Sequence, residues 1–295
     1  MQQSSESMYQ GRRLPRPDEE VTDQGLGFDL ATLMRRRQLL RAFGAGAAVL
    51  GIAACTREPA TPATPAPPAT GAPSAAPASS PAAAGIRIPE ETQGPFPGDG
   101  SNGPDVLERS GVVRSDVRAS LDGSGPVPGV ALALELTVSD LATGGGPLTG
   151  AAVYIWQCDR DGRYSMYSDG VTRQTFLRGV QIVDRAGKVR FTSVFPGCYP
   201  GRWPHVHFEV YPDRAGITDH TAVIATSQLA FPQGVCEEAY AQPGYRESAA
   251  NLAGVTLDTD MVFRDDHAVT QMATVTGDAV QGYAASLAVH VDTRR

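Results

Sequence analysis

The sequence has little charge and few of the side chains that usually bind metals. Charged residues make up 19% of the 295 residues, with five histidines and four cysteines. The 25 Lys and Arg are outnumbered by 32 Asp and Glu, so the chain lacks the basic surplus that nucleic-acid binding requires. It also has no phosphate-cradling glycine motif, no Gly-x-Ser-x-Gly elbow and no internal repeat. Hydrophobic residues nevertheless make up 41% of the chain, which argues against global disorder.

The first 55 residues contain the features of an export signal. The run from Arg36 to Arg41 resembles a twin-arginine signal, and the uncharged stretch that follows, about 13 residues long, is too short to span a bilayer. Residues 52–55, Ile-Ala-Ala-Cys, resemble a bacterial lipobox, so we expect Cys55 to be lipidated. The mature protein would be exported and held by this lipid at the cell surface or on the periplasmic side of a membrane, unless it is released. Met34 directly precedes the signal, so we expect translation to start there rather than at Met1.

Composition divides the rest of the chain into two parts. Residues 56–85 are dominated by proline and alanine and are expected to form an extended tether without a core. Residues 86–295 carry the net negative charge and are expected to form one folded domain.

Short apolar runs separated by turns predict that this domain is all-β, an antiparallel β-sandwich of about eight strands with long loops. The expected strands are 131–138, 151–158, 176–183, 188–195, 205–211, 222–230, 270–277 and 284–291. Turns are expected at 159–162, as a hairpin, and at 184–187. Along 131–138, four apolar residues alternate onto one face. Residues 237–252 are expected to hold one or two short helices.

His205 and His207 are the pair that most suggests a metal site. Two residues apart on a strand, they lie on one face, with Val206 and Phe208 on the other. Such a pair is a common half-site for a transition metal, although pairs with a purely structural role also occur. Glu209 continues the same face, so a two-histidine, one-carboxylate iron(II) site is one alternative.

Residues 155–165 and 196–208 together resemble the intradiol ring-cleavage dioxygenases of the protocatechuate 3,4-dioxygenase and catechol 1,2-dioxygenase type. The resemblance extends from about residue 90 to about 290. It implies a bound iron(III), which two anionic phenolates and two neutral imidazoles favour. Because the pKa of tyrosine is ordinarily about 10, a metal is needed to ionise it near neutrality. The implied ligands are Tyr164, Tyr199, His205 and His207.

The same resemblance implies roles for further residues. Tyr199 would leave the metal when substrate binds and accept a proton, Arg202 would stabilise negative charge on the ring, and Gln228 would orient the substrate. The segment formed by Thr92, Gln93, Gly94, Pro95 and Phe96 would line the substrate pocket. The implied reaction is cleavage of a catechol by O2 to a muconate-type dicarboxylate. The alternative is a non-catalytic surface module that binds a metal or another ligand.

Several properties stay open at this point. The acidic composition favours an uncharged catechol or hydroxyquinol over an aromatic carboxylate, but the substrate and the oligomeric state are not fixed. Exported relatives suggest a disulfide between Cys198 and Cys236, with Cys158 left as a buried thiol. The other tyrosines and histidines are expected to be structural.

Overall fold

The computed structural model describes residues 8–9, 12–13 and 85–294. The chain divides into two compact units, Met1–Ala78 and Ser79–Arg295. In the first, the two-residue strands β1 (Met8–Tyr9) and β2 (Arg12–Arg13) pair antiparallel. The expected export signal, Cys55 and the tether up to residue 84 lie outside the described residues. Among those that are described, no helix combines the length and apolarity needed to cross a membrane.

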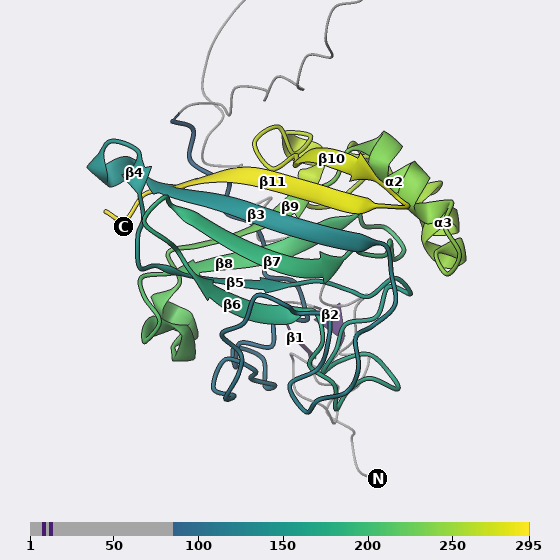
Figure 1. The fold of residues 1–295 in the computed structure, drawn as a ribbon, viewed down its shortest axis with the longest axis horizontal. Helices are drawn as coiled ribbons and strands as arrows, with labels where there is room; N and C mark the ends of the chain where they lie inside the picture. The colour runs from purple at the N-terminus through teal and green to yellow at the C-terminus, as the bar shows by residue number, and fades with distance from the viewer. Residues whose placement is uncertain (1–7, 10–11, 14–84, 295) are drawn as a thin grey trace, which may run out of the picture. The chain divides into compact units, whose positions relative to one another are not determined.

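The second unit is a sandwich of two β-sheets, which confirms the predicted all-β fold (Figure 1). One sheet has the order β10-β11-β3-β4, with β7 also paired to β3, and the other has the order β6-β5-β8-β9. The strands are β3 (Ala131–Asp140), β4 (Gly146–Pro147), β5 (Ala152–Trp156), β6 (Arg178–Ile182), β7 (Lys188–Val194), β8 (His205–Tyr211), β9 (Ala225–Ala230), β10 (Thr274–Asp278) and β11 (Gly282–Val291). The sandwich is not wholly antiparallel, because β3 and β11 run parallel.

The core lies between the two sheets. The predicted alternation along β3 is confirmed, because every second residue of this strand is buried. These residues share one apolar cluster with the inward-facing residues of β5 and β8, among them Val153, Ile155, Val206 and Phe208. Each buried side chain of this kind stabilises the fold by about 1.5–3 kcal/mol. The pleat therefore turns the alternate residues of β5 and β8 toward the outer side of the four-stranded sheet.

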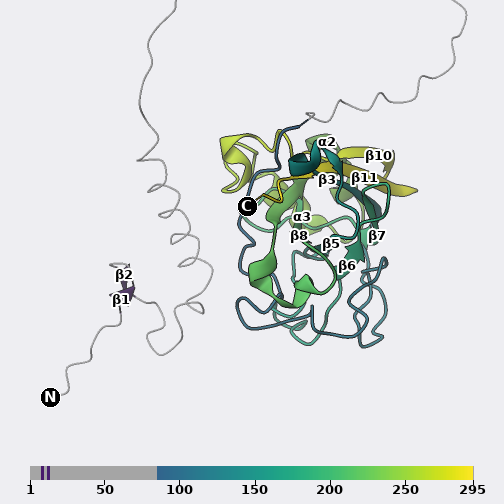
Figure 2. The ribbon, with the colours of Figure 1, turned by 90° about the vertical axis from the view of Figure 1, so that its left-hand side faces the viewer.

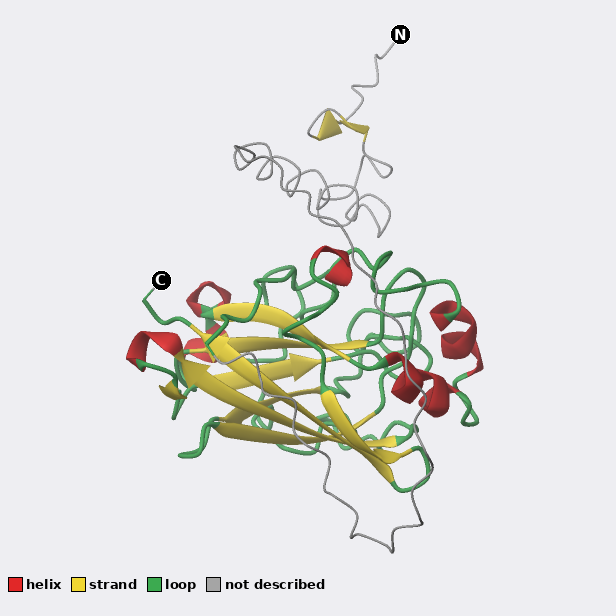
Figure 3. Ribbon diagram, turned by 90° about the horizontal axis from the view of Figure 1, so that it is seen from above, coloured by secondary structure: helices red, strands yellow, loops and turns green. Residues whose placement is uncertain are grey.

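Two short helices lie at one end of the sandwich, as predicted: α2 (Gln233–Tyr240) and α3 (Arg246–Leu252). Figure 3 shows that the helical segments occupy the periphery of the strands. Side chains in and beside these helices anchor the loop after β7. The Tyr240 hydroxyl donates to the carbonyl of Pro196 at 3.0 Å, and Asn251 Nδ2 donates to the carbonyl of Cys198 at 2.8 Å. The helices thus fix the chain on both sides of Gly197.

Loops cover the outer side of the four-stranded sheet. Val112, Val106 and Leu107 pack there against aromatic residues of β5 in a second apolar cluster. The backbone of Val180 in β6 exchanges hydrogen bonds with Val112 and Arg114, which holds this early segment beside the sheet. In Figure 2 the early segment, coloured dark blue, forms loops below β5 and β6.

The two predicted turns are present, and the turn at 184–187 connects the two strands expected on either side of it. The turn at 184–187 carries the chain from β6 to β7, and so from one sheet to the other. The turn at 159–162 does not close a hairpin, because the chain continues as a loop until β6 begins at Arg178. This long loop carries Tyr164. The prediction of a hairpin was wrong, since the next stretch is fixed by contacts with distant segments.

Candidate metal centre

The four predicted metal ligands meet at one point. His205 and His207 project from β8, Tyr164 lies in the loop after β5, and Tyr199 lies in the loop before β8. His205 Nε2 is 3.1 Å from His207 Nε2, 3.4 Å from the Tyr164 oxygen and 3.3 Å from the Tyr199 oxygen. Donor atoms that share one ion at about 2.1 Å lie roughly 3 Å apart. The arrangement therefore fits a single metal ion.

Both imidazoles are in the state that binds metals. Burial lowers the pKa of His205 to about 3 and holds the pKa of His207 well below its usual value, and the charge of Arg202 lowers both further. His205 Nδ1 lies 2.5 Å from the carbonyl of Trp203, which as acceptor places the ring proton there and leaves Nε2 with a free lone pair. The site thus offers two neutral nitrogen donors.

The two tyrosines differ in how deeply they are buried. Burial raises the pKa of both hydroxyls, and the nearby Arg202 opposes that rise. Without a strong cation they are neutral phenols, so the donor set calls for a highly charged ion to ionise them. Tyr164 is 1% exposed, whereas Tyr199 is half-buried on its loop. Tyr199 is therefore the ligand with more freedom to turn away.

Arg202 is held beside the site by a carboxylate that sequence reasoning missed. Its Nε donates to Asp260 Oδ2 at 2.9 Å, and its Nη1 lies 3.4 Å from the Tyr199 oxygen. Asp260 is fully buried and also accepts from the backbone N–H groups of Trp203 and Phe263. Nothing in the local sequence distinguishes this aspartate, because its partner lies far away along the chain.

Gln228 connects Arg202 to the predicted pocket segment. Its Oε1 accepts from Arg202 Nη2 at 2.6 Å, and its Nε2 donates to the carbonyl of Thr92 at 2.9 Å. Both halves of the amide are engaged, so Gln228 holds the site together. The structure brings it to the candidate metal centre, but as a support for Arg202.

The predicted pocket segment passes directly over the ligands. A Cβ added to Gly94, whose φ is +72°, would lie 3.4 Å from the His207 ring, so glycine permits this close approach. The Phe96 ring lies 5.0 Å from the ring of Tyr164, and the carbonyl of Pro95 accepts from Asn102. The segment is thus a wall of the site.

Comparison with known proteins agrees with this geometry. Residues 102–220, which include all four candidate ligands, match a family model described as Dioxygenase. A 66-residue stretch is 35% identical to the chlorocatechol 1,2-dioxygenase of Rhodococcus opacus, covering 22% of this chain and about a quarter (26%) of that relative. An intradiol ring-cleavage dioxygenase from Tetranychus urticae superimposes with a TM-score of 0.56 and 24% identity, covering 71% of this chain and 96% of that one.

The domain has the intradiol dioxygenase fold. The sandwich agrees with the fold that the resemblance implied, and the family model matches residues 102–220 of this domain. The matched region contains Arg202 but ends before Gln228 and Asp260.

Within this dioxygenase fold the alternative iron(II) site does not form. Glu209 Oε2 accepts from the Tyr211 hydroxyl at 2.9 Å, and burial raises the pKa of the Glu209 carboxyl to about 8. Across residues 85–294 no three His, Cys, Asp or Glu side chains are placed to hold a metal together. Glu209 belongs instead to the packing of the outer face.

The expected Cys198–Cys236 disulfide is not present. Cys158, Cys198 and Cys236 are all buried thiols, which confirms the expectation for Cys158 alone. The Cys198 thiol donates to the carbonyl of Arg202 at 3.3 Å, and the Cys236 thiol to that of Phe231. The helical end of the dioxygenase fold is therefore held by hydrogen bonds and packing.

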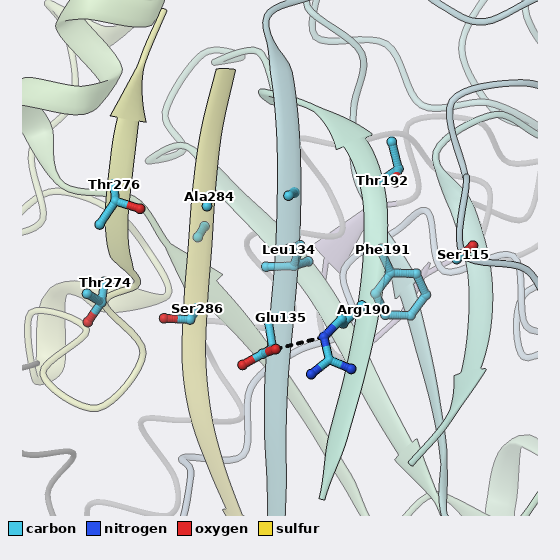
Figure 4. A pocket seen from close by; sticks show the side chains of 12 residues that line it. Ser115, Leu134, Glu135, Arg190, Phe191, Thr192, Thr274, Thr276, Ala284 and Ser286 are labelled. Atoms are coloured by element: carbon cyan, nitrogen blue, oxygen red, sulfur yellow. Dashed lines mark ion pairs between the residues drawn. The ribbon is translucent and has the colours of Figure 1, made fainter. Parts of the chain in front are cut away.

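A separate hollow of about 480 Å³ lies on the exposed side of the five-stranded sheet (Figure 4). Small side chains such as Ala133, Ala284 and Ser286 form much of its lining, beside the ion pair of Arg190 with Glu135. It opens on the opposite sheet from the histidines, so it is not the candidate metal centre.

Proposed function

We propose that the domain catalyses intradiol cleavage of a catechol by O2, using an iron(III) ion. The main support is that two phenol oxygens and two imidazole nitrogens lie close together, with the other three atoms 3.1–3.4 Å from His205 Nε2. Tyr164, Tyr199, His205 and His207 would hold the ion. The similarity to dioxygenases in sequence and fold supports the reaction class.

Iron(III), when bound, would ionise the tyrosines, bind the catechol oxygens and make the ring reactive toward O2. In the overall reaction, the bond between the two oxygen-bearing carbons breaks. Each of these carbons receives one atom of O2 and becomes a carboxyl group, giving a muconate-type dicarboxylate. O2 is the oxidant, and no further reductant is consumed.

Tyr199 would act as the proton acceptor. As a phenolate, its oxygen takes a hydroxyl proton from the arriving catechol and becomes a neutral phenol. Its half-buried position lets that phenol turn aside, whereas the fully buried Tyr164 stays in place. Arg202, at 3.4 Å from the Tyr199 oxygen, would stabilise negative charge on the bound ring.

An uncharged catechol or hydroxyquinol is the proposed substrate class. Arg202 already donates to Asp260 and to Gln228, so most of its capacity is taken up within the protein. A substrate carboxylate would have to compete with these buried partners. The apolar ring of Phe96 beside Tyr164 suits an aromatic ring and excludes water.

The test is spectroscopy and turnover of purified, iron-loaded protein. We expect a broad visible band from tyrosinate-to-iron(III) charge transfer. We also expect one O2 consumed per ring cleaved when catechol, hydroxyquinol and protocatechuate are compared. A colourless protein with stoichiometric iron would overturn the ligand assignment. A coloured protein that consumes no O2 with any of these compounds would instead favour a non-catalytic metal-binding module.

We further propose that the enzyme acts outside the cytoplasm, on the basis of the sequence signals around Cys55. Metabolic labelling with a fatty acid should mark the wild-type chain but not Cys55→Ser. Equal labelling of both chains would contradict this proposal.

A further inference from the structure

Arg178, the first residue of β6, is a buried cation that makes no hydrogen bond to a carboxylate within the described part of the chain. It is 1% exposed, and all five of its N–H groups are used. Nε donates to the Ser165 hydroxyl at 3.0 Å. Nη1 donates to the carbonyl of Pro97 at 2.6 Å and to the Tyr154 hydroxyl at 2.9 Å. Nη2 donates to the carbonyls of Phe96 and Ser165, both at 2.9 Å.

A guanidinium with every donor engaged cannot also bind a substrate. Its partners come from three places: the pocket segment, the loop that carries Tyr164, and β5. The Tyr154 hydroxyl strengthens the junction by donating to the carbonyl of Pro97 at 2.7 Å. Arg178 therefore joins the wall of the site to the turn that presents one of the candidate ligands.

The backbone beside this junction is strained. Met166, which directly follows Ser165, has a φ of +72°. Leu177, which directly precedes Arg178, has a φ of +56°. A non-glycine residue in this region costs about 1–3 kcal/mol and persists where its surroundings over-determine it. Gly98 is constrained as well, because an added Cβ would lie 2.8 Å from Arg178 Nη1. Strained residues thus lie next to Arg178 itself and next to its partner Ser165.

A buried charge without a paired carboxylate lowers the free energy of unfolding. We therefore expect Arg178 to have a role that offsets this loss of stability. We propose that Arg178 is a positioning residue that fixes residues 96–98 against the Tyr164 turn. It thereby sets the space above Tyr164 and determines which ring substituents the site accepts. The part of this inference that concerns catechols rests on the proposed function.

The expected kinetic effect follows from what Phe96 contacts. In wild type the ring centroids of Phe96 and Tyr164 lie 5.0 Å apart. In Arg178→Met the Phe96 ring is no longer fixed at this distance, so a catechol ring should bind less tightly. We expect KM for catechol to rise about tenfold while kcat changes by less than about threefold, because ground-state positioning is what is lost. The preference for catechol over 4-methylcatechol should fall by a similar factor.

Arg114 provides a matched control. It is a half-buried arginine whose guanidinium also donates to backbone carbonyls, those of Ala119, Thr175 and Arg178. None of these partners is in the pocket segment. Arg114→Gln should therefore lower stability without changing KM or the preference between the two catechols.

The decisive measurement is hydrogen exchange in the metal-free protein, which does not depend on turnover. The Gly98 N–H donates to the Tyr167 hydroxyl at 2.8 Å and reports on residues 96–98, which Arg178 is proposed to fix. Its exchange should be at least about tenfold faster in Arg178→Met than in wild type, and unchanged in Arg114→Gln. If Arg178→Met does not fold, Tyr154→Phe, which removes one hydroxyl from the same junction, should give a smaller acceleration.

Unchanged exchange at the N–H groups of Phe96 and Gly98 in the folded variant would show that Arg178 does not fix residues 96–98. If wild type cleaves catechols and Arg178→Met has the same KM and the same preference between the two catechols, Arg178 does not determine specificity. If wild type cleaves no catechol, the proposed function fails, while the exchange result still decides whether Arg178 fixes the segment.

Discussion

The indole ring of Trp156 lies parallel to the imidazole ring of His207, with centroids 4.8 Å apart and 8° between the planes. The two residues are direct neighbours across β5 and β8. His207 Nδ1 has no hydrogen-bond partner among the described side chains and backbone, whereas His205 Nδ1 lies at the carbonyl of Trp203. Stacking therefore does for His207 what a hydrogen bond does for His205: it fixes the plane of the ring.

Replacing Trp156 should weaken metal binding without touching a ligand. We expect Trp156→Leu to lower the affinity for iron(III) at least about tenfold, as loss of a partner that orients a ligand commonly does. Trp156→Phe keeps an aromatic ring beside His207 and serves as the control, with a smaller loss. Competition with a chelator measures the affinity, and equal affinities for both variants would show that the stack does not orient His207.

The two tyrosines should respond differently to loss of their hydroxyls. Tyr164→Phe should lose most bound iron, because this buried residue cannot be replaced by water from outside. Tyr199→Phe should retain iron, shift the visible band and lose kcat by about 100-fold or more, because the proton acceptor is gone. Metal analysis, absorption spectra and turnover separate these outcomes, and a Tyr199→Phe enzyme with normal kcat would exclude the proposed proton transfer.

Local patterns predicted the part of the site that lies on one strand. The alternation of His205 and His207 with Val206 and Phe208 requires no knowledge of the rest of the chain, since the strand pleat alone separates the two faces. The pocket segment was predicted from resemblance, and the structure places it over His207.

Supports that join distant segments escaped prediction. Arg202 and Asp260 are 58 residues apart, and Arg178 and Phe96 are 82 apart. The parallel pairing of β3 with β11 was missed for the same reason. Such contacts depend on how whole layers pack, and each residue taken alone is an ordinary polar side chain.

The buried Arg202–Asp260 pair should be important for both stability and turnover. Asp260→Asn leaves Arg202 buried without its counter-charge, which should cost about 3–5 kcal/mol in the free energy of unfolding. The released guanidinium should also lower kcat. In a double-mutant cycle with Arg202→Gln, measured by urea unfolding, the two losses should be clearly non-additive. Additive losses would mean that the two side chains do not depend on one another.

A carboxylate remote from the candidate metal centre should make the stability of the fold sensitive to acid. Asp140, the last residue of β3, accepts from the Thr293 hydroxyl at 2.7 Å and from the Ala142 N–H at 2.9 Å. Burial would raise the pKa of Asp140, but these hydrogen bonds outweigh it, so the pKa lies below its usual value.

Because the folded pKa is lower than the unfolded value of about 3.9, the ionised carboxylate stabilises the fold above that pH. This stabilisation is lost as the pH falls through the folded pKa. Asp140→Asn in the metal-free protein should therefore lower the free energy of unfolding at pH 7, and the difference from wild type should shrink below about pH 4. Thr293→Val, which removes one donor, should reproduce part of the effect. Urea unfolding across this range measures it, and a constant difference between wild type and Asp140→Asn would show that the ionised carboxylate contributes nothing.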